Sequence, residues 1–331
     1  MQKLLTVIVP VYKVEAYINK CLDSLLVSSD LMKKLEVIIV NDGTPDNSAE
    51  MSREYVKKYP ETFRQIDKEN GGHGSAWNVG LKEATGKYLR FLDSDDWLTN
   101  LPEFISKLDT CDADVVITRL NRYYEDSHTS EISQCPKTID HVLPINKIGP
   151  EEFSDYNIIS NFWFSTYKTD MLKRLYPLFM EGVSYDDGIL FIIPLLFAKD
   201  YIAYDLVLYN YLLGREGQSM AAAIQVKKIP DRIKVLRQMC SFLNERVLEG
   251  DSGWLLKEIV GIRRNILIGL IASVKSFRKS SFYNTEFKSI QGISDFNPQS
   301  KLYKRYKKCP FIVFYVLERI RDYTSRRIIE S

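Results

Sequence analysis

The tetrapeptide Asp93-Ser94-Asp95-Asp96 follows an apolar run that ends at Leu92. Divalent cations such as Mn²⁺ and Mg²⁺ prefer oxygen ligands, and two carboxylates one residue apart at the end of a strand can supply one or two of them. A cation held there stabilises the negative charge that develops on a departing diphosphate. Short acidic motifs also occur in solvated loops that cap helices, so the tetrapeptide alone is compatible with both interpretations.

A second acidic pair, Asp186-Asp187, lies between Tyr185 and an apolar run that begins after Gly188. A carboxylate in such a pair can take the proton from a hydroxyl group as that group attacks a second substrate. The same dipeptide is also typical of a helix cap. Asp42, in the turn sequence Asn-Asp-Gly, likewise fits either a turn or a ligand-binding position.

Two basic side chains are candidates to meet an anionic ligand. His73 stands among Gly71, Gly72 and Gly74, and a glycine-rich loop of this kind lets the backbone approach a phosphate closely. A histidine exposed on a surface loop is the competing interpretation. Arg215 carries a planar guanidinium, which suits two parallel hydrogen bonds to a phosphate.

The elements that must position these residues alternate along the chain. Continuous apolar runs rich in β-branched residues predict buried parallel strands. These runs cover residues 4–9, 35–40 and 87–92. Apolar residues spaced three and four apart predict amphipathic helices. The helical patterns cover residues 17–26, 47–59 and 75–84.

This alternation predicts right-handed βαβ units and a mainly parallel sheet. Ligands of such sheets bind beyond the carboxyl ends of the strands, where Asp42 and residues 93–96 are expected to lie. One more strand is predicted over residues 115–117. Residues 123–148 are too polar and irregular to assign.

Several segments resemble the sequence motifs of one family, in order and in spacing. They are Thr6–Tyr12, Val37–Gly43, Asn70–Gly80, Gly86–Asp96, Tyr185–Asp187 and Arg215–Ser219. The family is that of the bacterial family 2 glycosyltransferases. The resemblance implies the GT-A fold, an α/β, Rossmann-like and mainly parallel sheet flanked by helices, followed in this chain by a C-terminal helical extension.

The resemblance implies a role for each candidate residue. The residues that it assigns to the nucleotide sugar are Pro10, Val11, Tyr12, Asp42, Asn70, His73, Asp93, Ser94 and Arg215. The first three frame the base, Asp42 accepts a hydrogen bond from it, and Arg215 contacts the diphosphate. Asp95 is implied to be the direct metal ligand, with Asp93 beside the ribose or the metal and Asp96 as a supporting residue or helix cap.

The general base implied by the resemblance is Asp187, with Asp186 beside it, in a place where the family usually has Glu-Asp. The chain departs from the family pattern at Trp77, where an arginine is usual. One expected contact to the diphosphate is therefore in question, and His73 and Arg215 are the candidates to replace it.

The activity implied is that of a non-processive, inverting transferase. It would move a hexose or N-acetylhexosamine from a UDP-sugar, with Mn²⁺ or Mg²⁺, to a hydroxyl of a glycan, lipid-linked or protein-linked acceptor. The Gln-x-x-Arg-Trp signature of processive members is absent from the sequence. Two alternative functions remain. One is that of a nucleotidyltransferase that makes nucleotide sugars, although such enzymes usually have a Gly-rich loop where this chain has Val9–Tyr12. The other is that of a non-enzymatic scaffold of the same fold.

The composition is that of a folded globular protein: 331 residues, 45% of them hydrophobic and 12% aromatic. The first apolar run contains Pro10 and is typical of a strand, not a leader, and no apolar run reaches the roughly 20 residues that cross a bilayer. We therefore expect a cytoplasmic protein. The 5 cysteines form no Cys-x-x-Cys pair, so we expect reduced thiols rather than disulfides or a zinc site.

We expect a catalytic domain over residues 1–223, with a nucleotide-binding half over about 1–120 and an acceptor half over about 121–223. A basic helical region is expected over 224–331. Residues 225–331 contain 22 Lys and Arg against 10 Asp and Glu, a net charge of +12, whereas the preceding residues contain 23 against 33, a net charge of −10.

Helical patterns in the basic region cover residues 229–248, 254–274 and 312–327. Cations and aromatic residues alternate there as in helices that lie on anionic lipid, which suits peripheral contact with the inner face of the cell membrane. Packing on the catalytic core or in a homo-oligomer is an equally open interpretation. We expect no nucleic-acid partner, because no recognised binding module is present.

Overall fold

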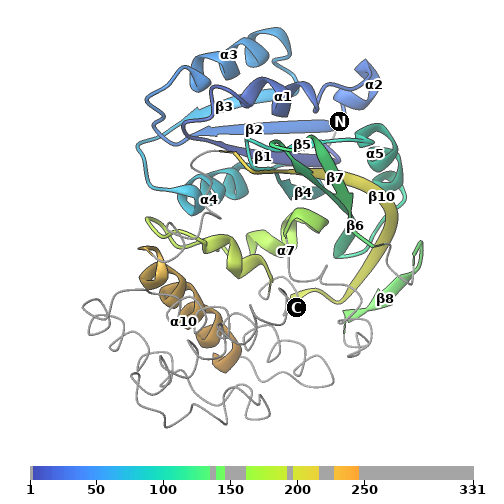
Figure 1. Cartoon of the computed structure of the whole chain (residues 1–331). Helices are drawn as coiled ribbons and strands as arrows, with labels where there is room; N and C mark the ends of the chain where they lie inside the picture. Colours follow the sequence, from blue (N-terminus) through green and yellow to red (C-terminus); the bar gives the residue numbers. More distant parts are fainter. Residues whose placement is uncertain (1–2, 135–138, 146–161, 192–196, 216–226, 246–331) are drawn as a thin grey trace, which may run out of the picture. The chain divides into compact units, whose positions relative to one another are not determined.

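The computed structural model of the protein describes residues 3–134, 139–145, 162–191, 197–215 and 227–245 (Figure 1). The described residues up to Arg215 belong to one compact unit, and helix α10 (Ile229–Glu245) belongs to another. Helix α10 confirms the first of the C-terminal helices. The other two, and the domain boundary predicted near residue 223, lie outside the described residues.

The first unit is built on a ten-stranded sheet in the order β3-β2-β1-β4-β9-β6-β10-β5, with β7 paired to β6 and β8 paired to β10. The strands are β1 (Leu5–Val11), β2 (Leu35–Asn41), β3 (Phe63–Asp67), β4 (Tyr88–Phe91), β5 (Trp97–Leu98), β6 (Val115–Tyr124), β7 (Thr129–Ile132), β8 (Val142–Pro144), β9 (Ser165–Lys168) and β10 (Asp200–Leu213).

Short helices connect these strands. They are α1 (Ile18–Asp23), α2 (Ser29–Met32), α3 (Ser48–Lys58), α4 (His73–Glu83), α5 (Leu101–Asp109), α7 (Thr169–Lys173) and the 3₁₀ helices η2 (Phe162–Phe164) and η3 (Asp186–Phe191). The fold is thus α/β, as expected, and the predicted helices and strands of the first 92 residues are confirmed to within a few residues.

The half of the sheet formed by β3, β2, β1 and β4 is parallel. Every residue of β1 and β2 is buried, which explains why both are continuous apolar runs. Helices α1 and α3 lie on one side of these strands and α4 on the other (Figure 1). Helix α4 packs closely on β1, because a Cβ atom added at Gly80 would lie 2.3 Å from Cγ2 of Ile8.

The other half of the sheet is mixed. Strand β9 is antiparallel to both β4 and β6, and β5, β7 and β8 pair antiparallel with their neighbours, whereas β6 and β10 are parallel to each other. The sequence pattern did not predict this, because residues such as 129–132 in β7 are all exposed and lack the alternation of a half-buried strand. The sheet is therefore parallel only where the apolar runs are continuous.

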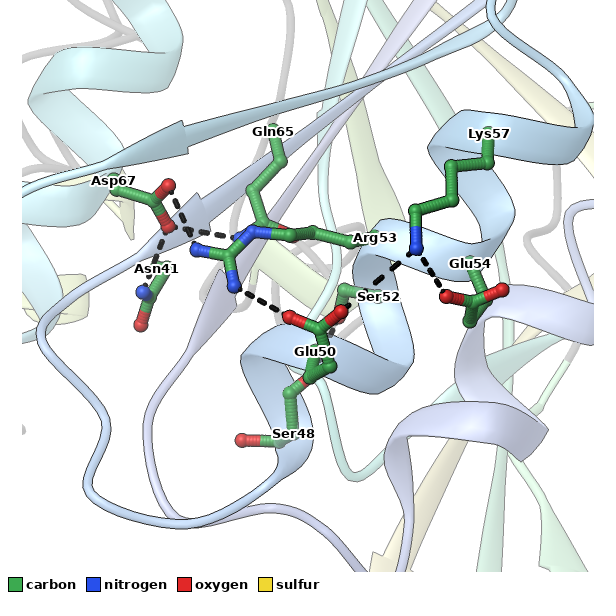
Figure 2. Close-up of polar contacts among 9 residues, drawn as sticks. All are labelled: Asn41, Ser48, Glu50, Ser52, Arg53, Glu54, Lys57, Gln65 and Asp67. Carbon is green, nitrogen blue, oxygen red and sulfur yellow. Dashed lines mark hydrogen bonds and ion pairs between the residues drawn. The ribbon is translucent and has the colours of Figure 1, made fainter.

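A polar network joins α3 to the ends of β2 and β3 (Figure 2). Arg53 donates to Glu50 at 2.8 Å and to Asp67 at 3.0 Å, and the side-chain amide of Asn41 donates to Asp67 at 2.8 Å. Asn41 immediately precedes Asp42, so the network holds the strand end from which that candidate residue projects.

A buried arginine links the parallel and mixed halves. Arg90 of β4 is fully buried, donates to Oγ1 of Thr166 at 2.8 Å and also donates to the carbonyl oxygen of Trp163. Burial lowers the pKa of its guanidinium to about 10. These hydrogen bonds position η2 and β9 against β4, next to the acidic tetrapeptide.

No helix in the described part of the chain is both long and apolar enough to cross a membrane. Cys21 and Cys111 are buried free thiols, in agreement with the reduced cysteines expected from the sequence.

Candidate functional site at the carboxyl ends of the strands

The candidate residues that follow β1, β2 and β4 lie at one edge of the sheet. Strand β1 is parallel to both of its neighbours, with Val11 opposite Asn41 and Ile8 opposite Phe91. Tyr12, Asp42 and Asp93 come directly or almost directly after these strands. The register therefore brings the predicted nucleotide-binding and metal-binding segments together.

Asp93, Asp95 and Asp96 form a cluster in which one carboxylate oxygen of each residue lies within 4.8 Å of the others. The side chains of Asp93 and Asp95 keep 23% and 14% of their surface exposed, whereas Asp96 is buried. An all-oxygen set of this size suits a hard divalent cation, with water or phosphate completing the coordination. Two of the three carboxylates remain accessible to such an ion.

Asp96 is held by strand β10. Its carboxylate accepts a hydrogen bond from the hydroxyl of Tyr209 at 2.6 Å and another from the backbone N–H of Leu212 at 2.8 Å. Burial, together with the charges of Asp95 and Asp93, raises the pKa of Asp96 well above its usual range. These contacts give Asp96 a supporting position beneath the two more exposed carboxylates.

Asp95 is paired with Arg215. The guanidinium donates from Nε to Oδ2 of Asp95 at 2.6 Å, and its Nη2 forms an ion pair with the same oxygen at 2.5 Å. It lies 5.5 Å from the centre of the Tyr17 ring. Burial and the charge of Asp93 raise the pKa of Asp95, while Arg215 acts in the opposite direction. The predicted metal ligand and the predicted phosphate ligand are therefore in direct contact.

His73 is the other basic residue at the cluster. Its Nε2 lies 3.1 Å from Oδ1 of Asp93, and its ring packs 4.0 Å from that of Trp77. Trp77 is fully buried against Phe91 and other rings, so its side chain belongs to the core and does not face a phosphate. The two candidates to replace the missing family arginine, His73 and Arg215, each contact one carboxylate of the cluster.

Asp42 is 3% exposed and organises the loop that precedes α4. Its carboxylate accepts hydrogen bonds from Lys68 at 2.6 Å and from the backbone N–H groups of Gly71 and Gly72 at 2.9 and 2.8 Å. The side chain of Asn70 donates to the carbonyl oxygen of Asp42 at 2.9 Å. Asp42 and Asn70 therefore hold each other and the glycine loop next to His73.

The remaining nucleotide-binding candidates differ in exposure. Pro10, Val11 and Ser94 are buried, whereas 44% of Tyr12 is exposed. Of these four residues, Tyr12 therefore has the side chain best placed to cover a base.

Asp187, at the start of η3, is partly exposed. The backbone N–H of Gly182 donates to the carbonyl oxygen of Gly71 at 2.8 Å, which ties the segment before η3 to the glycine loop. The charges of the cluster and of Asp187 all act on the hydroxyl of Tyr211. The hydrogen bond from Gly182 thus connects the segment that leads to Asp187 with the glycine loop, and the side chain of Asp186 lies outside the described part.

Sequence reasoning missed several residues that support the site. Asn78 is 2% exposed, and its side chain makes three hydrogen bonds to the backbone of Leu178 and Phe179 in the segment that leads to η3. Tyr209 and Tyr211 stand two apart in β10, a spacing that places both on one face of a strand. This spacing was the one feature of the sequence that could have linked the two tyrosines, but it does not indicate that they lie beside the acidic cluster.

Known proteins resemble this chain in sequence and in fold. The model of the family described as Glycosyl transferase family 2 matches residues 6–175. The glycosyltransferase GlyA of Streptococcus pneumoniae serotype 4 is 29% identical over 272 residues, which are 80% of this chain and 37% of GlyA. The chain thus spans little more than a third of that relative.

Two solved structures share the fold. S. aureus TarS 1-349, in complex with UDP-GlcNAc, superposes with a TM-score of 0.72 at 21% identity, covering 97% of this chain and 92% of TarS 1-349. The mannosyltransferase PcManGT of Pyrobaculum calidifontis, in complex with GDP-Man and Mn²⁺, has a TM-score of 0.51 at 15% identity, covering 97% and 88%. With the family model matching more than half of its residues, the chain belongs to glycosyl transferase family 2.

Proposed function

We propose that this protein transfers a hexose or N-acetylhexosamine from a UDP-sugar to a hydroxyl of a glycan, lipid-linked or protein-linked acceptor, with inversion at the sugar carbon. The observation that supports the proposal is the cluster of carboxylates after β4, where Asp93, Asp95 and Asp96 each offer an oxygen within 4.8 Å of the others. Asp93 and Asp95 follow β4, and Asp187 comes from η3. The UDP-GlcNAc bound to TarS makes that nucleotide sugar the first donor to test.

Asp95 and Asp93 are the residues that would hold Mn²⁺ or Mg²⁺, since their oxygens are accessible and close enough to share one ion. The ion would stabilise the negative charge of the UDP leaving group. Asp96, with both oxygens accepting hydrogen bonds from β10, orients this segment.

The nucleotide is proposed to bind next to the same edge. Tyr12 covers the base with its exposed ring, while Pro10 and Val11 shape the strand end. Asp42 and Asn70 recognise the edge of the base. Asp42 accepts a hydrogen bond from the base through a carboxylate oxygen that also accepts one from the backbone of the glycine loop. Ser94 lies between the ligands Asp93 and Asp95, where its backbone can meet the ribose.

The diphosphate is proposed to bind Arg215 and His73. A guanidinium can form two parallel hydrogen bonds to phosphate oxygens. That of Arg215 now forms a hydrogen bond and an ion pair with Asp95. His73 contacts Asp93 and belongs to the first turn of α4, where backbone N–H groups and the helix dipole favour an anion.

Asp187 is proposed as the general base, with Asp186 beside it. Inversion requires the acceptor oxygen to attack from the side opposite the leaving group, so the base and the diphosphate site must lie on different sides of the sugar. Asp187 and the metal ligands come from different elements, which suits this arrangement. Asp187 is partly exposed, which suits contact with an acceptor hydroxyl.

UDP release tests the proposal. The full chain, incubated with UDP-GlcNAc and a panel of other UDP-sugars, is expected to release UDP with Mn²⁺ and not with EDTA. Pyrophosphate release from UTP and sugar phosphates would instead identify a nucleotidyltransferase. An absence of both products would identify a non-enzymatic scaffold.

Two substitutions separate metal binding from proton transfer. Asp95→Ala should abolish metal-dependent UDP binding, because it removes the direct ligand. Asp187→Asn should leave UDP binding unchanged and stop transfer, because the amide cannot accept the proton. Asp205→Asn, at a surface ion pair with Arg119, is the matched control. Transfer by Asp187→Asn at the control's rate would refute the assignment of the base.

We also propose that the chain is divided into a catalytic domain and a basic C-terminal region. Residues 1–223 form the catalytic domain, with its nucleotide-binding half over about 1–120, and residues 224–331 form the basic region. Peripheral contact of the basic region with anionic lipid would bring the site to a lipid-linked acceptor. Sedimentation with anionic and neutral vesicles distinguishes this from packing in a homo-oligomer.

A further inference from the structure

Strand β10 presents two tyrosines to the aromatic residues of η2. Tyr209 meets Phe162 edge to face, with ring centres 6.4 Å apart at an angle of 88°. Tyr211 stacks on Trp163, with ring centres 4.2 Å apart at an angle of 24°. Because alternate residues of a strand share a face, the two pairs form successive layers, with the Tyr211 layer closer to the carboxyl end of β10.

The two hydroxyl groups differ in what they contact. Tyr209 is fully buried, donates to Asp96 at 2.6 Å and accepts from the backbone N–H of Asp93 at 3.2 Å. Tyr211 is partly exposed, and its hydroxyl has no hydrogen-bond partner among the residues that the structure describes. Tyr209 therefore supports the acidic cluster, whereas the hydroxyl of Tyr211 can still donate and accept a hydrogen bond.

Several carboxylates act on the phenol of Tyr211. Burial and then the charges of the 93–96 cluster and of Asp187 raise the pKa of its phenol above the usual range. The hydroxyl therefore stays protonated and can donate a hydrogen bond. A hydroxyl that can both donate and accept a hydrogen bond suits a neutral group rich in oxygen, such as a sugar hydroxyl.

The position of Tyr211 also indicates which part of the substrates it can contact. Its neighbours in β10, Tyr209 and Leu212, both donate hydrogen bonds to Asp96. Arg215, two residues beyond the end of the strand, contacts Asp95. The charge of Asp187 also contributes to the raised pKa of Tyr211. If the cluster holds the diphosphate and Asp187 faces the acceptor, the group between them is the transferred sugar.

We propose that Tyr211 binds the transferred sugar of the donor, with its hydroxyl donating to an oxygen of the sugar ring or its substituents and its ring held in place by Trp163. The inference rests on the proposed function. It assigns to Tyr211 a contact with the sugar moiety, distinct from the residues proposed to bind the base, the diphosphate and the metal.

Calorimetric titration of the full chain with UDP and with UDP-GlcNAc, both in the presence of Mn²⁺, tests this. Tyr211→Phe should weaken UDP-GlcNAc binding by about threefold to tenfold, the value of one hydrogen bond, and leave UDP binding unchanged. The melting temperature should not fall, since the lost hydroxyl has no partner in the described protein. If the UDP-release assay identifies a different UDP-sugar as the donor, that sugar is used in this titration in place of UDP-GlcNAc.

Tyr59→Phe is the matched control, because Tyr59 is also partly exposed, its hydroxyl also has no partner in the described part, and it lies before β3 at the opposite end of the strands. Equal weakening of UDP and UDP-GlcNAc, or unchanged binding of both, would overturn the assignment of Tyr211. If the unmodified chain binds no UDP-sugar and releases no UDP, the proposed function fails instead. The two failures are therefore distinguishable.

Discussion

Replacing Arg215 with methionine is expected to strengthen Mn²⁺ binding in the absence of nucleotide. The guanidinium now forms a hydrogen bond and an ion pair with Oδ2 of Asp95 and neutralises the carboxylate proposed to bind the ion. A metal ion that binds Asp95 must displace these contacts. Methionine keeps the apolar length of the side chain beside Tyr17 and removes the competing charge.

The size of the effect follows from the burial of the pair. The side chains of Arg215 and Asp95 are 22% and 14% exposed, so solvent screens their attraction only in part. Hydrogen bonds to charged groups contribute about 1.5–3 kcal/mol, and partial exposure reduces this to roughly 1–2 kcal/mol. Mn²⁺ should therefore bind Arg215→Met about 5- to 30-fold more tightly than the unmodified chain.

The assay is a titration of free Mn²⁺ by electron paramagnetic resonance, with and without UDP. Arg119→Met is the control, because Arg119 pairs with Asp205 at 2.7 Å and is 23% exposed, much like Arg215. With UDP present, Arg215→Met should bind the nucleotide more weakly, since a phosphate ligand is lost. Unchanged or weaker Mn²⁺ binding without UDP would refute the idea that Arg215 competes for Asp95.

Two further substitutions test the supports of the site. Tyr209→Phe removes the donor to buried Asp96 and should lower the free energy of unfolding in urea by about 1–3 kcal/mol; a loss below the error of the titration would show that Asp96 needs no such partner. Gly80→Ala adds a Cβ atom 2.3 Å from Ile8 and should cost about 1–3 kcal/mol by overpacking, more than the roughly 1 kcal/mol gained in helix propensity; a rise in stability would contradict this packing.

The parallel half of the fold could be predicted because its local patterns are strong. Strands β1 and β2 are buried on both faces and read as continuous apolar runs, and the helices between them have clear apolar stripes. Parallel pairing then places the ends of β2 and β4 at one edge without further information. Asp42 and the 93–96 cluster were found for that reason.

The supports of the site could not be predicted, because they depend on pairings between distant segments. The hydroxyl of Tyr209 meets Asp96 across 113 positions of the chain, and Arg215 meets Asp95 across 120. Trp77 fills the core beside Phe91 although its position in the family motif suggested a ligand contact. The spacing of residues in the sequence does not indicate which distant strand will contact an acidic loop.

The dependence of the cluster on β10 has a consequence for synthesis on the ribosome. Both described side-chain contacts of Asp96 come from residues 209 and 212, more than a hundred positions after the cluster itself has been made. Until β10 emerges and docks, neighbouring negative charges in residues 93–96 lack the contacts that hold them together. The proposed ion site should therefore form in one late step, when β10 docks beside residues 93–96.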